Sequence, residues 1–277
     1  MIDYIKMDFY RMRKQKTFWI FAIIVFAVTF IIPIIIRLFL NMMYDMTQSI
    51  PMEGIEDSSL EISQETIIPK DIPFSSLLRA PFGAITALII FSLVFAANFF
   101  HADIGNGYIK NLAGRAAKIG RLAISKFIVV FVEIVFIFIS ALIGTILGNL
   151  IAYGISFDAD IGMGILELLT KLLMAWAMAS EVLFFAAGLR VKALAIVFAV
   201  FLGTGMFSLI IAPINFGIQQ LSKNYEFQLN KFFPDQLFMI TDMQAADINL
   251  LYGVISSAVL IVVCVFFTYL IANKKDI

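Results

Sequence analysis

The sequence has few of the groups on which catalysis and metal binding usually depend. Its 277 residues include one Cys (Cys264) and one His (His101), so no intrachain disulfide can form and no His, Cys and carboxylate cluster suits a metal ion. No candidate nucleophile has a suitable base. We therefore expect no catalytic residue, no metal site and no enzymatic activity in this chain, and structural roles for Cys264 and His101.

Charge is also scarce. Charged residues make up 14% of the chain, against about 25% in a typical soluble domain. Apolar residues make up 61%, and the mean hydropathy is +0.96. This composition excludes a disordered chain and a disulfide scaffold, argues against an ordinary soluble enzyme, and is typical of an integral membrane protein.

Six stretches are long and apolar enough to cross a bilayer, because a hydrocarbon core of about 30 Å needs about 20 helical residues. They are residues 17–39, 81–100, 124–153, 163–189, 193–216 and 248–273. The chain outside them is too apolar to suggest a separate soluble domain. We therefore predict an all-α integral membrane protein with six transmembrane helices in a single domain, residues 1–277.

The distribution of Lys and Arg predicts the orientation of the chain. Fourteen of the 20 basic residues fall in the N-terminal segment, the second-to-third and fourth-to-fifth connections and the C-terminal tail, which six spans place on one side. Because Lys and Arg concentrate in cytoplasmic loops, both termini are predicted to be cytoplasmic. Residues 41–80 and 217–247 are then outer loops, in which we expect short interfacial helices.

Residues 1–16 are predicted to form an amphipathic helix on the inner membrane surface. Ile2, Ile5, Phe9 and Met12 fall within one arc at helical periodicity, and basic residues lie elsewhere on the circumference. The alternative is a basic tail that only fixes the topology.

The second-to-third connection, residues 101–122, is the longest cytoplasmic one, and it is basic and punctuated by glycine. Gly105 and Gly107 allow tight turns or a close approach of backbone. Tyr108 and Ile109 offer an apolar edge to a protein partner.

A loose motif occupies this connection: Asp-Ile-x-x-Gly-x-Ile-Lys-Asn at 103–111, then Gly114-Arg115, then Arg121-Leu-x-x-Ser-Lys126. It resembles the first cytoplasmic loop of ABC transporter permeases of the type 2 export class. Asp103 stands where Glu is more usual in that family, and Tyr108 where Thr is usual. The six predicted spans, the basic N-terminal helix and the two outer loops agree, so the resemblance covers the whole chain. It is nearest to small permeases that export lantibiotics, bacitracin-like peptides or modulin peptides.

The resemblance implies a transmembrane permease domain in which Asp103–Arg115 forms a coupling helix that docks into a separate ATPase subunit. The residues that it implicates in coupling are Asp103, Gly107, Tyr108, Ile109, Lys110, Asn111 and Arg115. It also implies two copies of a cassette ATPase, which hold ATP and Mg, and a second permease subunit, identical or related, in a bacterial plasma membrane. No nucleic-acid partner is expected.

The sequence contains no phosphate-binding loop of its own. The pattern G-x-x-x-x-G-K-[ST] is absent, so this chain cannot hold ATP by a P-loop. Gly105-x-Gly107 is no substitute, because Lys110 stands where G-x-G-x-x-G needs its third Gly. We therefore expect no cofactor on this chain, and an active transporter of this kind takes its energy from a partner.

Four ionisable residues that lie four or more residues inside the predicted spans are candidates for function, because each costs at least about 2.5–3.5 kcal/mol at a helix centre. Glu133 and Glu181 are candidates for lining one cavity, where they would attract cationic peptides or take up a proton. Alternatively, each bonds a Ser, Thr or amide on a neighbouring helix. Glu167 and Lys171, four residues apart on one helical face, are expected to form a structural ion pair, with substrate exit as the alternative.

Small residues recur every four positions on the third predicted span, at Ser140, Gly144, Gly148 and Ala152. Such a stripe lets another helix approach closely. We expect it to pack against a span of the same subunit, with a dimer contact as the alternative. Gly203, Gly205 and Pro213 in the fifth span permit bending, or reflect the tolerance of membrane helices for glycine and proline, and the same two interpretations apply to Pro33 in the first span.

Three functions remain open at this stage. The favoured one is the membrane-spanning subunit of an ATP-driven exporter of amphipathic or antimicrobial peptides or apolar drugs. The second is an ion-coupled secondary transporter with Glu133 and Glu181 as proton sites. The third is a membrane anchor or sensor that transports nothing.

Overall fold

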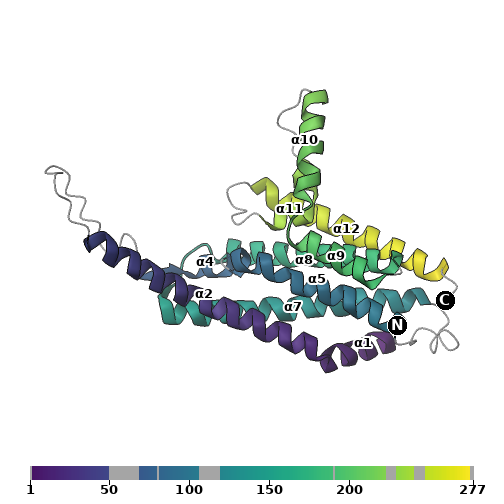
Figure 1. Ribbon diagram of the computed structural model, residues 1–277, viewed down its shortest axis with the longest axis horizontal. Helices are drawn as coiled ribbons and strands as arrows, with labels where there is room; N and C mark the ends of the chain where they lie inside the picture. The colour runs from purple at the N-terminus through teal and green to yellow at the C-terminus, as the bar shows by residue number, and fades with distance from the viewer. Residues whose placement is uncertain are drawn as a thin grey trace.

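The computed structural model describes residues 2–49, 69–79, 81–105, 119–189, 191–222, 229–239 and 247–274. These residues are almost entirely helical, and the long helices lie side by side in an elongated bundle from which α10 projects (Figure 1). The helices are α1 (Ile2–Lys14), α2 (Lys16–Ser49), α4 (Phe74–Arg79), α5 (Pro81–Gly105), α7 (Ile119–Ala152), α8 (Ile161–Gly188), α9 (Lys192–Gly203), α10 (Ser208–Ser222), the 3-10 helix η1 (Leu229–Phe232), α11 (Pro234–Phe238) and α12 (Asp247–Lys274). The sheet within the described ranges consists of two short strands, β1 (Asp71–Pro73) and β2 (Gly154–Ser156).

Four helices, α2, α7, α8 and α12, are long and apolar enough to cross a membrane, and α9 with α10 makes a fifth candidate if the bent pair is one span. The second predicted span corresponds to α5, whose described side chains form a shorter apolar helix, Leu88–Ala102. The described residues therefore show four or five candidate spans rather than the six predicted from the sequence.

The fifth predicted span, residues 193–216, is divided into two helices, and Gly205, one of the residues at which the sequence permits bending, lies in the break. α9 ends at Gly203, α10 begins at Ser208, and the two are bent by 61°. The 12 residues of α9 extend about 18 Å, which is short of a hydrocarbon core of about 30 Å. α9 alone is therefore too short to cross, and the bent pair has the form of a broken span or a re-entrant loop.

The stripe of small residues on α7 lies against α2. The stripe consists of Ser140, Gly144, Gly148 and Ala152. Ser140 Oγ donates a 2.9 Å hydrogen bond to the carbonyl oxygen of Ala22. Farther along, a Cβ on Gly148 would overlap the carbonyl oxygen of Phe30. Because residue numbers rise together along both helices, α2 and α7 run parallel, and their backbones are closer than larger side chains permit.

The packed core lies between α5, α7 and α8. Leu93, Ile134 and Val182, one from each helix, are fully buried. The outward faces of α2 and α12 are apolar as well: Ile23 is 63% exposed and Val262 is 67% exposed. A bundle that is apolar both inside and outside fits lipid as its solvent.

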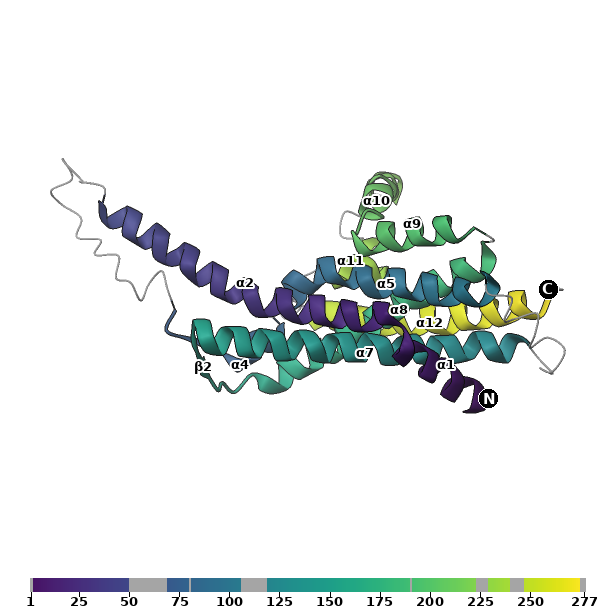
Figure 2. The ribbon, with the colours of Figure 1, turned by 60° about the horizontal axis from the view of Figure 1, so that its bottom comes forward.

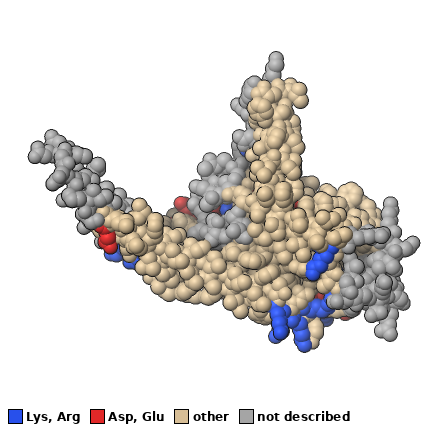
Figure 3. Space-filling model, in the orientation of Figure 1, with Lys and Arg blue, Asp and Glu red and all other residues tan. Residues whose placement is uncertain are grey.

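The two ends of the bundle differ. At one end β1 pairs in parallel with β2, and Asp158 accepts hydrogen bonds from the backbone N–H of Ser75, at 3.1 Å, and from its hydroxyl, at the start of α4. At the other end lies α1 (Figure 2). At this same end, the N–H of Gly120 on α7 donates a 3.1 Å hydrogen bond to Oδ1 of Asn273 on α12. α7 therefore starts beside the end of α12. Exposed basic side chains gather around α1 (Figure 3). The exposed basic residues of α1 and of the starts of α2, α7 and α9 are Lys6, Arg13, Lys14, Lys16, Arg121 and Lys192.

Candidate functional site

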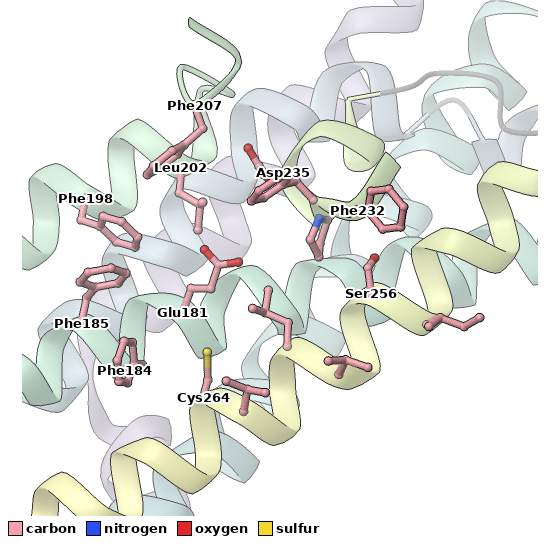
Figure 4. Close-up of a pocket in the computed structure, with 16 residues that line it drawn as sticks. Glu181, Phe184, Phe185, Phe198, Leu202, Phe207, Phe232, Asp235, Ser256 and Cys264 are labelled. Carbon is pink, nitrogen blue, oxygen red and sulfur yellow. The ribbon is translucent and has the colours of Figure 1, made fainter. Parts of the chain in front are cut away.

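A cavity of about 590 Å³ lies between α8 and α12 (Figure 4). α9 and the turn after it, η1 and α11 complete its wall. The lining residues that Figure 4 labels are Glu181, Phe184, Phe185, Phe198, Leu202, Phe207, Phe232, Asp235, Ser256 and Cys264. This volume falls within the range of about 300–1,000 Å³ that is typical of small-molecule sites.

The cavity exists because α9 stops early. Gly205 has a φ of 67°, in the left-handed region that favours glycine. The N–H of Gly205 donates to the carbonyl of Leu202 at 3.1 Å, and the N–H of Met206 donates to that of Phe201 at 3.2 Å. These two bonds form a Schellman motif, which satisfies the last carbonyls of α9 and turns the chain away. The space that a continuous helix would occupy is therefore left to η1 and α11.

Two carboxylates line the cavity, Glu181 from α8 and Asp235 from α11 (Figure 4). Asp235 is buried, and its Oδ2 accepts a 2.7 Å hydrogen bond from Nε2 of Gln236. Burial raises the pKa of the Asp235 carboxyl, and the hydrogen bonds from Gln236 oppose that rise. Of the described residues that line the cavity, none is Lys, Arg or His.

The rest of the wall is apolar and rich in aromatic rings. The ring centroids of Phe185 and Phe198 are 3.9 Å apart, and those of Phe198 and Phe207 are 5.6 Å apart, so α8, α9 and the turn after α9 share one aromatic cluster. Phe232 of η1 lies 5.5 Å from the ring of Tyr252 on α12. These contacts hold the short elements against the long helices and give the cavity a firm apolar wall.

Glu133 does not line this cavity. It lies on α7, fully buried, and its Oε1 accepts a 3.2 Å hydrogen bond from the hydroxyl of Ser92 on α5. Its Oε2 has no hydrogen-bond partner within the described ranges. The structure therefore does not bring Glu133 and Glu181 together at this cavity. The bond to Ser92 fits the alternative prediction for Glu133, that it is hydrogen-bonded to a Ser, Thr or amide on a neighbouring helix.

No protein-family model, no curated protein and no solved structure matches this chain. The resemblance to type 2 export permeases therefore stays a prediction from the motif of residues 103–126.

Glu167 and Lys171 lie one turn apart on α8, and both are 1% exposed. Both side chains are excluded from solvent, and the ion pair that their spacing predicts stays a prediction. Within the described ranges no group of three His, Cys, Asp or Glu side chains is arranged to hold a metal ion. The single histidine, His101, is buried near the end of α5.

Most residues of the predicted coupling segment lie outside the described residues: Gly107, Tyr108, Ile109, Lys110, Asn111 and Arg115. Asp103 belongs to the last turns of α5, which runs to Gly105, and α7 begins at Ile119. The structure thus describes both helices that flank this connection. They are in contact there, because Lys126 Nζ of α7 is 4.6 Å from the ring centroid of Phe99 of α5.

α1 is held to α7 by a buried acidic residue. Asp8 is fully buried, and its Oδ2 accepts a 2.5 Å hydrogen bond from the hydroxyl of Ser125. Met12, one turn later, is also buried, whereas Ile2 is 68% exposed and Phe9 43% exposed. The apolar arc predicted for residues 1–16 is therefore divided: Met12 packs in the bundle, and Ile2 and Phe9 face outward.

Sequence reasoning missed Asp8 and Asp235. Asp8 lies four residues before Met12, so the two share a helix face, and a carboxylate beside an apolar position was a detectable signal. Asp235 follows Phe232, Phe233 and Pro234, and a Pro after aromatic residues marks a helix start packed against a core. Nothing local indicated that α11 would bring Asp235 to Glu181.

Proposed function

We propose that this chain is the membrane-spanning permease subunit of an ATP-driven exporter for amphipathic peptides or apolar drugs. One observation carries the proposal. The two helices that flank the motif-bearing connection, α5 and α7, meet at the end of the bundle that also holds α1 and the end of α12. A partner that grips this connection acts on all four elements.

Contacts between the flanking helices support a mechanical role. Near the connection, Lys126 Nζ lies over the rings of Phe99 and Phe100, at 4.6 and 5.9 Å from their centroids. Deeper in the bundle, Ser92 is hydrogen-bonded to Glu133. Because α5 and α7 are joined at both levels, a displacement of the connection moves them together. In the proposed cycle, ATP closes the partner ATPases and the two helices carry that motion into the bundle.

The charge at this end favours a cytoplasmic location, where an ATPase would be. Exposed Lys and Arg gather around α1, whereas most of the other coloured surface is uncharged apart from acidic and basic side chains on the far part of α2 and near the middle of the molecule (Figure 3). Basic residues concentrate on the cytoplasmic side of membrane proteins. The inward-open and outward-open states of the exporter must also differ in their affinity for the nucleotide-bound ATPase. A partner that binds both states equally well does not change the equilibrium between them.

The proposal predicts that a cassette ATPase is encoded beside this chain, and it is tested by co-purifying the two proteins. Asp103→Lys and Ile109→Asp should abolish both association and stimulation of ATP hydrolysis, because one reverses a charge and the other removes an apolar contact at the predicted coupling helix. Asp45→Lys is the matched control, since it makes the same charge change at an exposed position on the far part of α2. Unchanged association in both coupling variants would contradict the proposal.

The ion-coupled alternative is favoured by one observation, the burial of Glu133 with one carboxyl oxygen lacking a hydrogen-bond partner within the described ranges. A carboxyl group inside a bundle is the usual proton site of such transporters. The two functions are separated by reconstituting the chain alone in liposomes with a proton gradient. Uphill transport without any ATPase would support the alternative and overturn the exporter.

A further inference from the structure

The cavity between α8 and α12 holds two carboxyl groups, those of Glu181 and Asp235. Among the described residues that line it, no basic side chain accompanies them. Glu181 has no hydrogen-bond partner within the described ranges, and its side chain extends into the cavity in Figure 4. Cys264 and Ser256 are the polar neutral groups that Figure 4 labels. Two carboxylates in an apolar enclosure favour a cation that is itself poorly hydrated.

The apolar wall excludes an inorganic cation as the natural occupant. A divalent ion such as Ca²⁺ takes six to eight oxygen ligands, and Mg²⁺ keeps a strict octahedral shell. The lining offers two carboxylates and the Ser256 hydroxyl, and the wall is otherwise mainly aliphatic and aromatic. A small ion would lose its water without replacement. An organic cation carries its own apolar shell, and Phe rings stabilise positive charge at their faces.

The size of the cavity selects the scale of the ligand. A volume of about 590 Å³ suits one drug-sized molecule and is too small for a folded peptide. Part of the wall belongs to the exposed face of α12: Ile255, Val259 and Val263 line the cavity and are 52%, 58% and 42% exposed. The cavity therefore borders the outward apolar surface, where hydrophobic molecules dissolved in a bilayer accumulate.

We propose that this cavity binds a hydrophobic organic cation of drug size, with the positive group at Glu181 and Asp235 and the apolar body against Phe185, Phe198 and Phe207. This proposal rests on the proposed function, because it identifies hydrophobic organic cations as the substrates of the exporter. The binding itself requires no ATPase.

Tetraphenylphosphonium and tetraphenylborate provide a matched pair of probes, because they have nearly the same shape and opposite charge. Equilibrium dialysis against the purified full chain in detergent should show saturable binding of the phosphonium and none of the borate. Glu181→Gln and Asp235→Asn should each weaken phosphonium binding about tenfold, the loss expected for one charged contact. Asp45→Asn removes the same charge from an exposed position and should leave binding unchanged.

A second variant guards against misfolding of the carboxylate variants. Ser256→Phe fills the cavity from α12 and leaves both acids in place, so it should abolish binding while the protein stays monodisperse. Equal binding of the two probes, or unchanged affinity in Glu181→Gln, would overturn the proposal. If binding fails while the ATPase still associates, the site is wrong and the exporter stands. If the phosphonium binds and no ATPase associates, the cavity site stands and the exporter function is wrong.

Discussion

At the scale of single residues, glycine sets how closely two long helices approach. Gly144 and Gly148 of α7 face the backbone of α2, and a Cβ on Gly144 would lie 2.7 Å from the carbonyl oxygen of Phe26. Real Cβ atoms do not come this near to a backbone oxygen, so either position can hold a side chain only if α2 moves. Because α2 also contacts α5, that movement would spread through the bundle.

Gly148→Ala should therefore destabilise the protein by about 1–3 kcal/mol, the usual cost of overpacking. The apparent Tm of the detergent-solubilised chain, followed by circular dichroism, should fall by several degrees. Gly162→Ala is the matched control, because nothing lies within 4 Å of a Cβ at this exposed helical position. It should be neutral or slightly stabilising. An equal Tm for the two variants would show that the α2–α7 contact is not as close as described.

At the scale of elements, α1 is held as much by polar as by apolar contacts. A lone 13-residue helix is marginal in water, so α1 depends on its neighbours. Asp8 is hydrogen-bonded to Ser125, and its Oδ1 is 3.6 Å from Nη1 of Arg11 on the same helix. Met12 adds buried apolar area. The buried carboxylate gives α1 one specific docking position on α7.

Asp8→Ala should release α1 from α7. A hydrogen bond to a buried charge contributes about 1.5–3 kcal/mol, so the population in which α1 is detached should rise by a factor of ten or more. Limited trypsin digestion measures this directly, because α1 carries Lys6, Arg13 and Lys14 as cleavage sites. Asp3→Ala changes an exposed acidic residue of the same helix and should leave the cleavage rate unchanged. Equal rates in the two variants would mean that Met12 alone holds α1.

At the scale of the whole molecule, the bundle has one basic end and one end closed by the β1–β2 pair. α1 and the last turn of α12 share the basic end, because Asp8 contacts the start of α7 and Asn273 contacts Gly120. The helices between them must therefore return the chain to the side on which it began. This arrangement agrees with termini on one side of a membrane, as the Lys and Arg distribution predicts.

Single cysteines in a Cys264→Ala background test this orientation. Phe157→Cys lies at the β2 end, where the native side chain is 80% exposed, and Lys6→Cys and Asn273→Cys lie at exposed positions of the basic end. A membrane-impermeant maleimide should label Phe157→Cys in intact cells. It should label the other two only after permeabilisation. Labelling of Lys6→Cys and Asn273→Cys from opposite sides would refute the shared end.

The helical character, the long apolar helices and the small-residue stripe on α7 could all be predicted from the sequence. These properties are local: hydropathy over about 20 residues and a four-residue spacing of small side chains need no knowledge of neighbours. The same local signals do not predict which glycine or proline within an apolar stretch ends a helix. Pro33 and Pro213 lie within α2 and α10, whereas the chain turns at Gly205. All three are residues that membrane helices tolerate.

The surroundings of each buried acid depend on contacts between helices that are far apart in the chain. Glu133 and Glu181 looked alike in the sequence, but one contacts Ser92 on α5 and the other lines a cavity with Asp235. The difference arises because α9 stops at Gly203 and leaves space in which α11 packs on α8. Contacts between segments so far apart in the chain depend on how helices fit together, and no pattern within a single helix encodes that fit.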